Sequence, residues 1–186
     1  MQTFAVYVDN KPGVLNRVSS LIRRRAFNIE SLTVGHTEKP GLSRMTIVID
    51  TDERGGRLVE ANLYKLIPVR RVDNITKTPQ IARDLALIKV AADGEARTHV
   101  MQLVDVYRAR IVDVSPDSLV VEATGAEDKI DSLVEVLRPY GVVEMVRTGR
   151  VAMARGGGSS SPEVTSHARI DGMEEGDDED TVSGSV

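Results

Sequence analysis

The sequence predicts an α+β fold made of two successive βαββαβ units, followed by a polar, acidic tail. Three observations lead to this prediction. Strand and helix patterns alternate in the order β-α-β-β-α-β over residues 2–76. The same order returns more faintly over residues 77–155. Beyond them the apolar periodicity stops in a segment rich in Gly, Ser, Asp and Glu.

In the first unit, short apolar strands alternate with helices that carry an apolar stripe. Val18 and Ile22 recur at the spacing of a helix. The turn-rich segment TEKPGL separates two strands as in a hairpin, and Pro68 is expected to end the second helix. The predicted strands and helices are, in order, residues 3–9, 15–22, 28–36, 43–50, 57–67 and 69–75. This order is that of a ferredoxin-like unit.

The second unit repeats the first. Its two helical stripes include Val104 and Leu133, and a turn at Pro116-Asp117 separates the middle strands. The predicted elements are, in order, residues 83–92, 100–107, 109–115, 118–124, 130–137 and 141–147. The predicted organisation is therefore a ferredoxin-like domain at residues 1–76, a second one at 77–155 and a tail at 156–186.

The tail carries the acidity of the chain. Its charges are Arg169 and eight acidic residues: Glu163, Asp171, Glu174, Glu175, Asp177, Asp178, Glu179 and Asp180. The first 155 residues hold 23 basic and 20 acidic side chains and are close to neutral. Because the tail has almost no apolar residues to offset the entropy of ordering, we expect it to be disordered. A solvated tail is favoured over an interaction tail.

The composition excludes several classes of protein and site. There is no cysteine, which rules out disulfides and thiolate chemistry, and a cytoplasmic location is expected. No apolar run reaches the length of a membrane span. The sequence has no nucleophile elbow, Walker loop or HExxH, and its three histidines are scattered. The strand at 43–50 lacks the aromatic residues of an RNA-recognition domain. A chain with no catalytic activity, metal site or nucleic-acid partner is therefore expected.

The turn at residues 9–13, DNKPG, is a candidate binding site. Pro12 fixes φ and Gly13 permits close backbone approach, so the amides that start the first helix can face outward. Free N–H groups at the positive end of a helix dipole suit a carboxylate. Asn10 adds an amide that suits the zwitterionic head of an amino acid. The alternative is a structural turn in which Asp9 or Asn10 caps the helix.

One helix end is too weak to be a whole site. Its dipole contributes ~0.3–1 kcal/mol, or up to ~2 kcal/mol when partly buried, whereas micromolar binding requires about 8 kcal/mol. The ligand must also bury its side chain and form charge-assisted hydrogen bonds, worth roughly 1.5–3 kcal/mol each. A second copy of the domain is the simplest source of that surface, with Asn28 as a polar contributor.

Three segments together resemble the regulatory small subunit of acetolactate synthase (acetohydroxyacid synthase). They are DNKPGVLNRV, FNIESLTVGHTE and LSRMTIVID. The resemblance continues through RDLALIKV, ARIVDVSPDSLVVEATG and KIDSLVEVLRPYG, and covers about residues 2–155. A turn like DNKPG is shared by many ACT domains, but the ordered combination of the three segments is specific for this family.

The resemblance implies an N-terminal ACT domain, a second ferredoxin-like domain and no active site in this chain. Family members dimerise side by side through their ACT domains, and valine or a related branched-chain amino acid binds at the interface. The implied ligand-binding residues are Asn10, Lys11, Pro12, Gly13, Val14 and Leu15 of one chain, with Asn28 and Ile29 of the other.

The resemblance also implies a partner. The catalytic large subunit uses thiamine diphosphate, Mg²⁺ and FAD to join two 2-oxo acids with loss of CO₂. The small subunit carries none of these cofactors, raises the activity of the large subunit and confers feedback inhibition. The acidic tail has no counterpart in the family pattern. A free-standing ACT-domain sensor or transcriptional regulator is the alternative, although the sequence shows no helix-turn-helix beside the domains.

Overall fold

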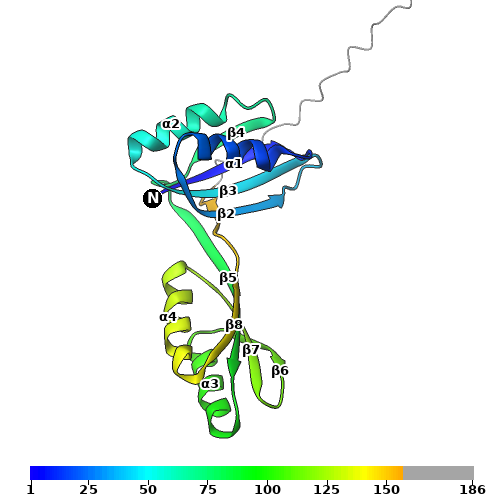
Figure 1. Cartoon of the computed structure of the whole chain (residues 1–186), viewed down its shortest axis with the longest axis vertical. Helices are drawn as coiled ribbons and strands as arrows, with labels where there is room; N and C mark the ends of the chain where they lie inside the picture. Colours follow the sequence, from blue (N-terminus) through cyan, green and yellow to red (C-terminus); the bar gives the residue numbers. More distant parts are fainter. Residues whose placement is uncertain (157–186) are drawn as a thin grey trace, which may run out of the picture.

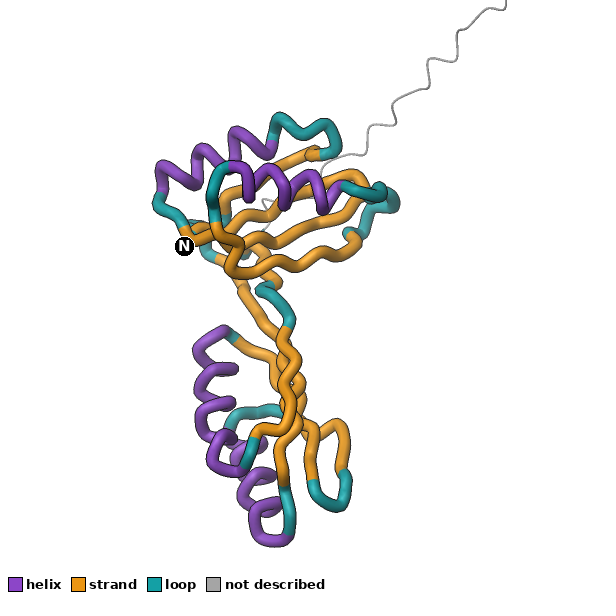
Figure 2. The backbone as a smooth tube through the Cα atoms, viewed as in Figure 1, coloured by secondary structure: helices purple, strands orange, loops and turns teal. Residues whose placement is uncertain are grey.

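The structure, a computed structural model, describes residues 1–156 and confirms the α+β fold of two βαββαβ units (Figure 1). In each unit the helices lie on one side of an antiparallel sheet (Figure 2). No helix in the described part of the chain is long and apolar enough to cross a membrane. The predicted disorder of the tail concerns residues that, apart from Gly156, lie outside the described ones.

The first unit is a four-stranded sheet in the order β2-β3-β1-β4, covered on one face by both of its helices. Its elements are β1 (Gln2–Asp9), α1 (Val14–Arg24), β2 (Asn28–His36), β3 (Leu42–Asp50), α2 (Glu53–Leu63) and β4 (Val69–Asn74). Phe4, Ile22, Ile47 and Leu63, all fully buried, lie in the core between sheet and helices. Because β2 and β4 are the edge strands, each leaves one side of its backbone without a ladder partner within the sheet.

The second unit has the strand order β6-β7-β5-β8 and its own core. Its elements are β5 (Gln80–Ala91), α3 (Gly94–Val106), β6 (Arg110–Val114), β7 (Ser118–Gly125), α4 (Glu127–Leu137), a 3₁₀ turn (Arg138–Tyr140) and β8 (Val142–Arg147). Along β7, Leu119, Val121 and Ala123 are buried while the residues between them are partly exposed. One face of this sheet is therefore packed and the other is open.

A short strand that the sequence analysis did not predict, β9 (Val151–Ala154), joins the two units. It pairs with the first four residues of β5 and lies against the face of the first sheet that the helices leave open. There Ala152 packs with Ala5, Tyr7 and Ile75. Because β1 is covered by helices on one face and by this ribbon on the other, all eight of its residues are buried.

The second helix begins four residues earlier than predicted. Asp52 caps it, its Oδ1 accepting a hydrogen bond from the backbone N–H of Gly55 at 2.7 Å, so α2 starts at Glu53. The helix also ends earlier, at Leu63, and Ile67 is 85% exposed rather than part of the apolar stripe. The helix start was predicted too late because Gly55 and Gly56 lie near it, and glycine is unfavourable inside helices.

Candidate functional site

The first helix has an open N-terminus, as the predicted site requires. Its N-cap, Gly13, is in the left-handed conformation with φ 80° and ψ −4°, and no side chain caps the helix. The first turn holds no acidic residue, so the positive end of the dipole is not neutralised locally. Space around Gly13 is open, since a Cβ built there would meet nothing within 4 Å. A small anion can therefore approach these backbone amides.

The alternative in which Asp9 or Asn10 caps this helix is wrong. The carboxylate of Asp9 is buried and accepts two hydrogen bonds from Arg70 of β4, one from Nε at 2.5 Å and one from a terminal nitrogen at 2.9 Å. Lys11 Nζ lies 3.3 Å from the same carboxylate. The hydrogen bonds from Arg70 lower the pKa of Asp9, although burial opposes the shift. Asp9 therefore anchors the turn to β4 instead of filling the helix end.

The other residues of the turn differ in accessibility. The backbone N–H of Asn10 donates to Gly41 O at 2.8 Å, and its exposed side-chain amide lies 3.5 Å from Nδ1 of His36. Lys11 and Pro12 are exposed. Val14 packs into the first core with 5% of its surface exposed, so only its backbone is available to a ligand. Leu15, 44% exposed, offers an apolar side chain beside the open helix start.

The remaining predicted residues, Asn28 and Ile29, lie at the start of β2. Asn28 is exposed, and its side-chain amide donates to Glu30. Ile29 is half-buried against the first core. They border a shallow hollow of about 350 Å³ between α1 and β2. Its other lining residues are Asn16, Ser19, Ser20, Arg23 and Phe27.

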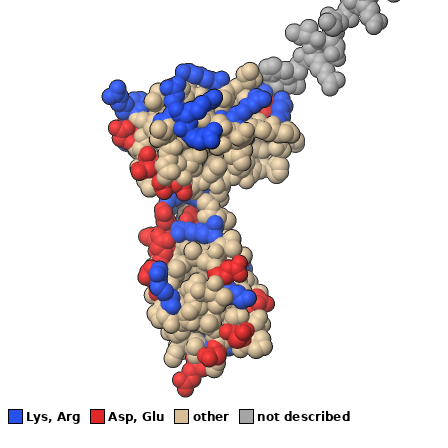
Figure 3. Space-filling view, viewed as in Figure 1, with Lys and Arg blue, Asp and Glu red and all other residues tan. Residues whose placement is uncertain are grey.

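Sequence reasoning missed the polar side of this hollow. Asn16, Ser19, Ser20 and Arg23 recur at the three- and four-residue spacing of one helix face. That spacing was readable from the sequence, but it resembles any solvated helix face. Exposed arginines of α1 and α2 also make the helical layer of the first unit cationic (Figure 3), which favours an anionic group there.

Within one chain the two groups of predicted residues do not meet. Asn10 lies beside His36 at the end of β2, whereas Asn28 begins the same strand. Eight residue steps separate the two ends, or roughly 26 Å at ~3.3 Å per residue. The turn and the hollow are therefore two separate surfaces of the monomer.

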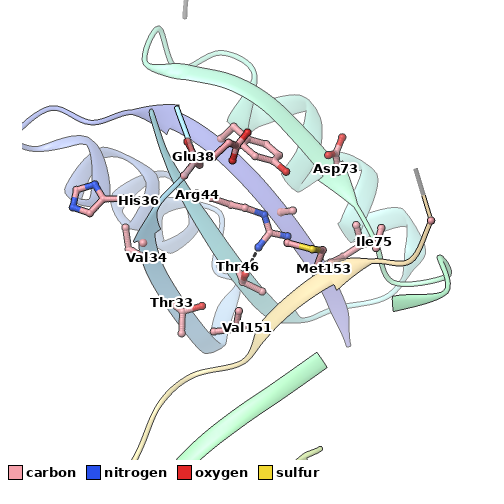
Figure 4. A pocket seen from close by; sticks show the side chains of 16 residues that line it. Thr33, Val34, His36, Glu38, Arg44, Thr46, Asp73, Ile75, Val151 and Met153 are labelled. Carbon is pink, nitrogen blue, oxygen red and sulfur yellow. Dashed lines mark hydrogen bonds between the residues drawn. The ribbon is translucent and has the colours of Figure 1, made fainter. Parts of the chain in front are cut away.

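A larger hollow, of about 510 Å³, lies on the opposite face of the first sheet beside β9 (Figure 4). Arg44 points into it and donates hydrogen bonds to Thr46 Oγ1 at 3.2 Å and to the backbone oxygen of Ala152 at 2.5 Å. Its guanidinium carbon also lies 5.7 Å from the centre of the Tyr7 ring. Arg44 thus holds β9 on the sheet, and none of the predicted ligand residues lines this hollow.

Comparison with known proteins assigns a family to both units. Residues 4–71 match the model described as the AHAS small subunit-like ACT domain, and residues 83–156 match the model for the small subunit of acetolactate synthase. The chain is 52% identical over 154 residues to a probable acetolactate synthase small subunit of Archaeoglobus fulgidus, covering 83% of this chain and 96% of that protein. It is 46% identical over 150 residues to the Bacillus subtilis acetolactate synthase small subunit, covering 80% and 87% respectively.

A solved structure agrees with these relatives. The acetolactate synthase small subunit of Thermotoga maritima superposes with a TM-score of 0.79 at 38% identity, covering 84% of this chain and 98% of that one. The agreement extends over both ferredoxin-like units and not the ACT domain alone. The chain therefore belongs to the family of acetolactate synthase small subunits.

Proposed function

We propose that this chain is a non-catalytic regulatory subunit, which binds valine between two ACT units and regulates a catalytic acetolactate synthase subunit. The catalytic subunit carries thiamine diphosphate, Mg²⁺ and FAD and converts two pyruvate molecules to 2-acetolactate and CO₂ in branched-chain amino-acid biosynthesis. The small subunit raises that activity in the cytoplasm, and valine reverses the effect. Family membership supports the assignment.

The observation that carries the proposal is the position of the predicted ligand residues at opposite ends of one edge strand. β2 has a free edge, and Asn10 and Asn28 lie near its two ends. If two copies of β2 pair antiparallel about a two-fold axis near Leu32, Asn28 of one chain meets the Asn10 end of the other. The same pairing covers both edges. A homodimer therefore completes two equivalent sites that the monomer lacks.

Each half supplies a different part of valine recognition. The open start of α1 and the Asn10 amide suit the carboxylate and ammonium groups, and the cationic helical layer adds long-range attraction for the carboxylate. Leu15 and the half-buried Ile29 offer apolar surface to the isopropyl group. Burying that group contributes roughly 1.5–3 kcal/mol, so both halves are needed to approach micromolar affinity.

Substitution of Gly13 tests the site. Gly13→Asp places a carboxylate where the ligand carboxylate binds, so we expect the valine concentration for half-inhibition to rise about 10- to 100-fold, the effect of one charge-assisted hydrogen bond. Gly13→Asn is the matched control, because asparagine has nearly the same size, tolerates positive φ and adds no charge. The assay is acetolactate formation by the reconstituted holoenzyme. Equal valine sensitivity of the two variants would place the site elsewhere.

Association with a catalytic subunit needs a separate test. The full chain, tagged and expressed in its own cell, should recover a large thiamine-diphosphate-dependent enzyme. The alternative function, a free-standing sensor or regulator, predicts recovery of DNA or of no enzyme. Recovery of the large subunit without valine-sensitive activity would retain the partner and reject feedback control.

A further inference from the structure

The chain between β8 and β9, Thr148–Arg150, runs against the exposed edge strand β2. Gly149 fits so closely that a Cβ added to it would lie 2.7 Å from Ser31 Oγ and 2.9 Å from the backbone oxygen of Leu32. The backbone N–H of Arg150 donates to Ser31 Oγ at 2.7 Å, and Thr33 Oγ1 donates to Arg150 O at 2.8 Å. Three consecutive residues of β2 thus hold this connection, and close approach rather than an unusual φ requires glycine at 149.

The same connection is bound to the second unit. Arg147 donates two hydrogen bonds to the buried carboxylate of Asp84 on β5, at 2.6 and 3.0 Å, and one to Asp131 of α4 at 2.6 Å. Arg150 forms an ion pair with Glu127 at the start of α4. The backbone N–H of Thr148 donates to Leu85 O at 2.9 Å. Movement of these four residues therefore displaces α4 and β5 as well.

We call residues Arg147–Arg150, which are held between β2 and the second unit, the clamp. A β-bulge of β2 connects the clamp to the proposed ligand site. The pairing of β2 with β3 shifts between Ile29 and Ser31, which leaves Glu30 as an extra residue. In a regular strand, residues 29 and 31 would face the same side of the sheet. The bulge places Ile29 against the helix-side core and Ser31 against the connection on the opposite face. One short stretch of β2 therefore carries the proposed ligand residue Ile29 on one face and contacts the connection to the second unit on the other.

We propose that residues Arg147–Arg150 form the link through which amino-acid binding at Asn28 and Ile29 reaches the second ferredoxin-like unit. This inference rests on the proposed function. In the proposed dimer β2 lies at the interface between the two copies, so a ligand bound beside Asn28 and Ile29 acts directly on this strand. Its shift is transmitted because the clamp is hydrogen-bonded and closely packed on both sides. Coupling requires the ligand to favour one of the two arrangements.

Two substitutions break the link at different points. Gly149→Ala forces the connection away from Leu32 O, and Glu127→Gln removes the charge that binds Arg150. Glu135→Gln is the matched control for the second change, because it breaks an exposed ion pair of α4 with Arg138 and leaves the contacts of Arg150 in place.

The experiment compares binding with response in the full chain. Valine affinity of the isolated small subunit is measured by calorimetry, and inhibition is measured in the reconstituted holoenzyme. We expect both test variants to keep valine affinity within about threefold while the extent of inhibition at saturating valine falls at least about fivefold, the scale of a typical coupling factor. The control Glu135→Gln should behave as the wild type does.

The outcomes distinguish this inference from the proposed function. Wild-type inhibition in both test variants overturns the link while leaving the valine site intact. Absence of valine binding to the wild-type chain overturns both. Because Glu127 is exposed and its replacement by Gln preserves shape, that variant tests the link even if Gly149→Ala fails to fold.

Discussion

The ion pair between Asp9 and Arg70 should hold the turn of the proposed ligand site in place, and Asp9→Asn removes this pair with little change of shape. Arg70 donates two hydrogen bonds to the carboxylate, and the exposed fractions of the two side chains are 8% for Asp9 and 18% for Arg70. Each charge-assisted hydrogen bond contributes roughly 1.5–3 kcal/mol, and removing one partner of a buried pair costs about 3–5 kcal/mol. Arg70 keeps some access to water, so we expect a loss near the lower end, about 3 kcal/mol.

Urea unfolding of the full chain, followed by circular dichroism, measures this loss. In a separate thermal unfolding experiment on the same chain, the melting temperature should fall by about 6–12 °C, given about 2–4 °C per kcal/mol for a chain of this length. Glu135→Gln is the control, since its pair with Arg138 is about two-thirds exposed and such pairs contribute about 0–1 kcal/mol. A loss below about 1 kcal/mol for Asp9→Asn would refute the reasoning that this pair anchors the turn.

Two further predictions concern stability. Hydrogen bonds from Arg70 lower the pKa of folded Asp9, so the stabilisation is complete above the unfolded pKa of about 3.9 and is lost as the pH falls through the folded value. Urea unfolding between pH 7 and pH 3 should therefore show a steeper loss for the wild type than for Asp9→Asn, and parallel curves would contradict this. Leu63→Ala empties a fully buried position and should cost about 2–5 kcal/mol. The exposed Leu58→Ala is its control, and equal losses would mean that Leu63 is not a core residue.

Much of the fold was predictable because it is encoded in local patterns. Alternation of apolar residues marks strands, and spacings of three and four mark helices, so the order of elements needs no tertiary information. The start of α2 was misplaced because Asp52 outweighed the two glycines that follow it. The strand β9 was missed because four residues with no clear alternation become a strand only when β5 and the open face of the first sheet lie beside them.

The site was predictable in part for the same reason. Pro12 and Gly13 indicate an uncapped helix start from backbone geometry alone. Capping by Asp9 was a reasonable local expectation, and it is wrong because Arg70, far away in sequence, competes for the carboxylate. The polar face that begins at Asn16 could be read as a periodicity, but only the fold places it beside β2.

The sequence by itself determined the two βαββαβ units and the resemblance to acetolactate synthase small subunits, which the relatives confirm. It offered the open helix start at Gly13 as one of two interpretations of the turn, and the structure decided between them. The tertiary structure decided which polar groups meet. It paired Asp9 with Arg70, set Gly149 against Ser31 and turned Ile29 and Ser31 to opposite faces through a bulge. The physical reason is that periodicity and backbone preference act over a few neighbouring residues. The partner of a buried charge or a close backbone contact depends instead on which distant strand lies alongside.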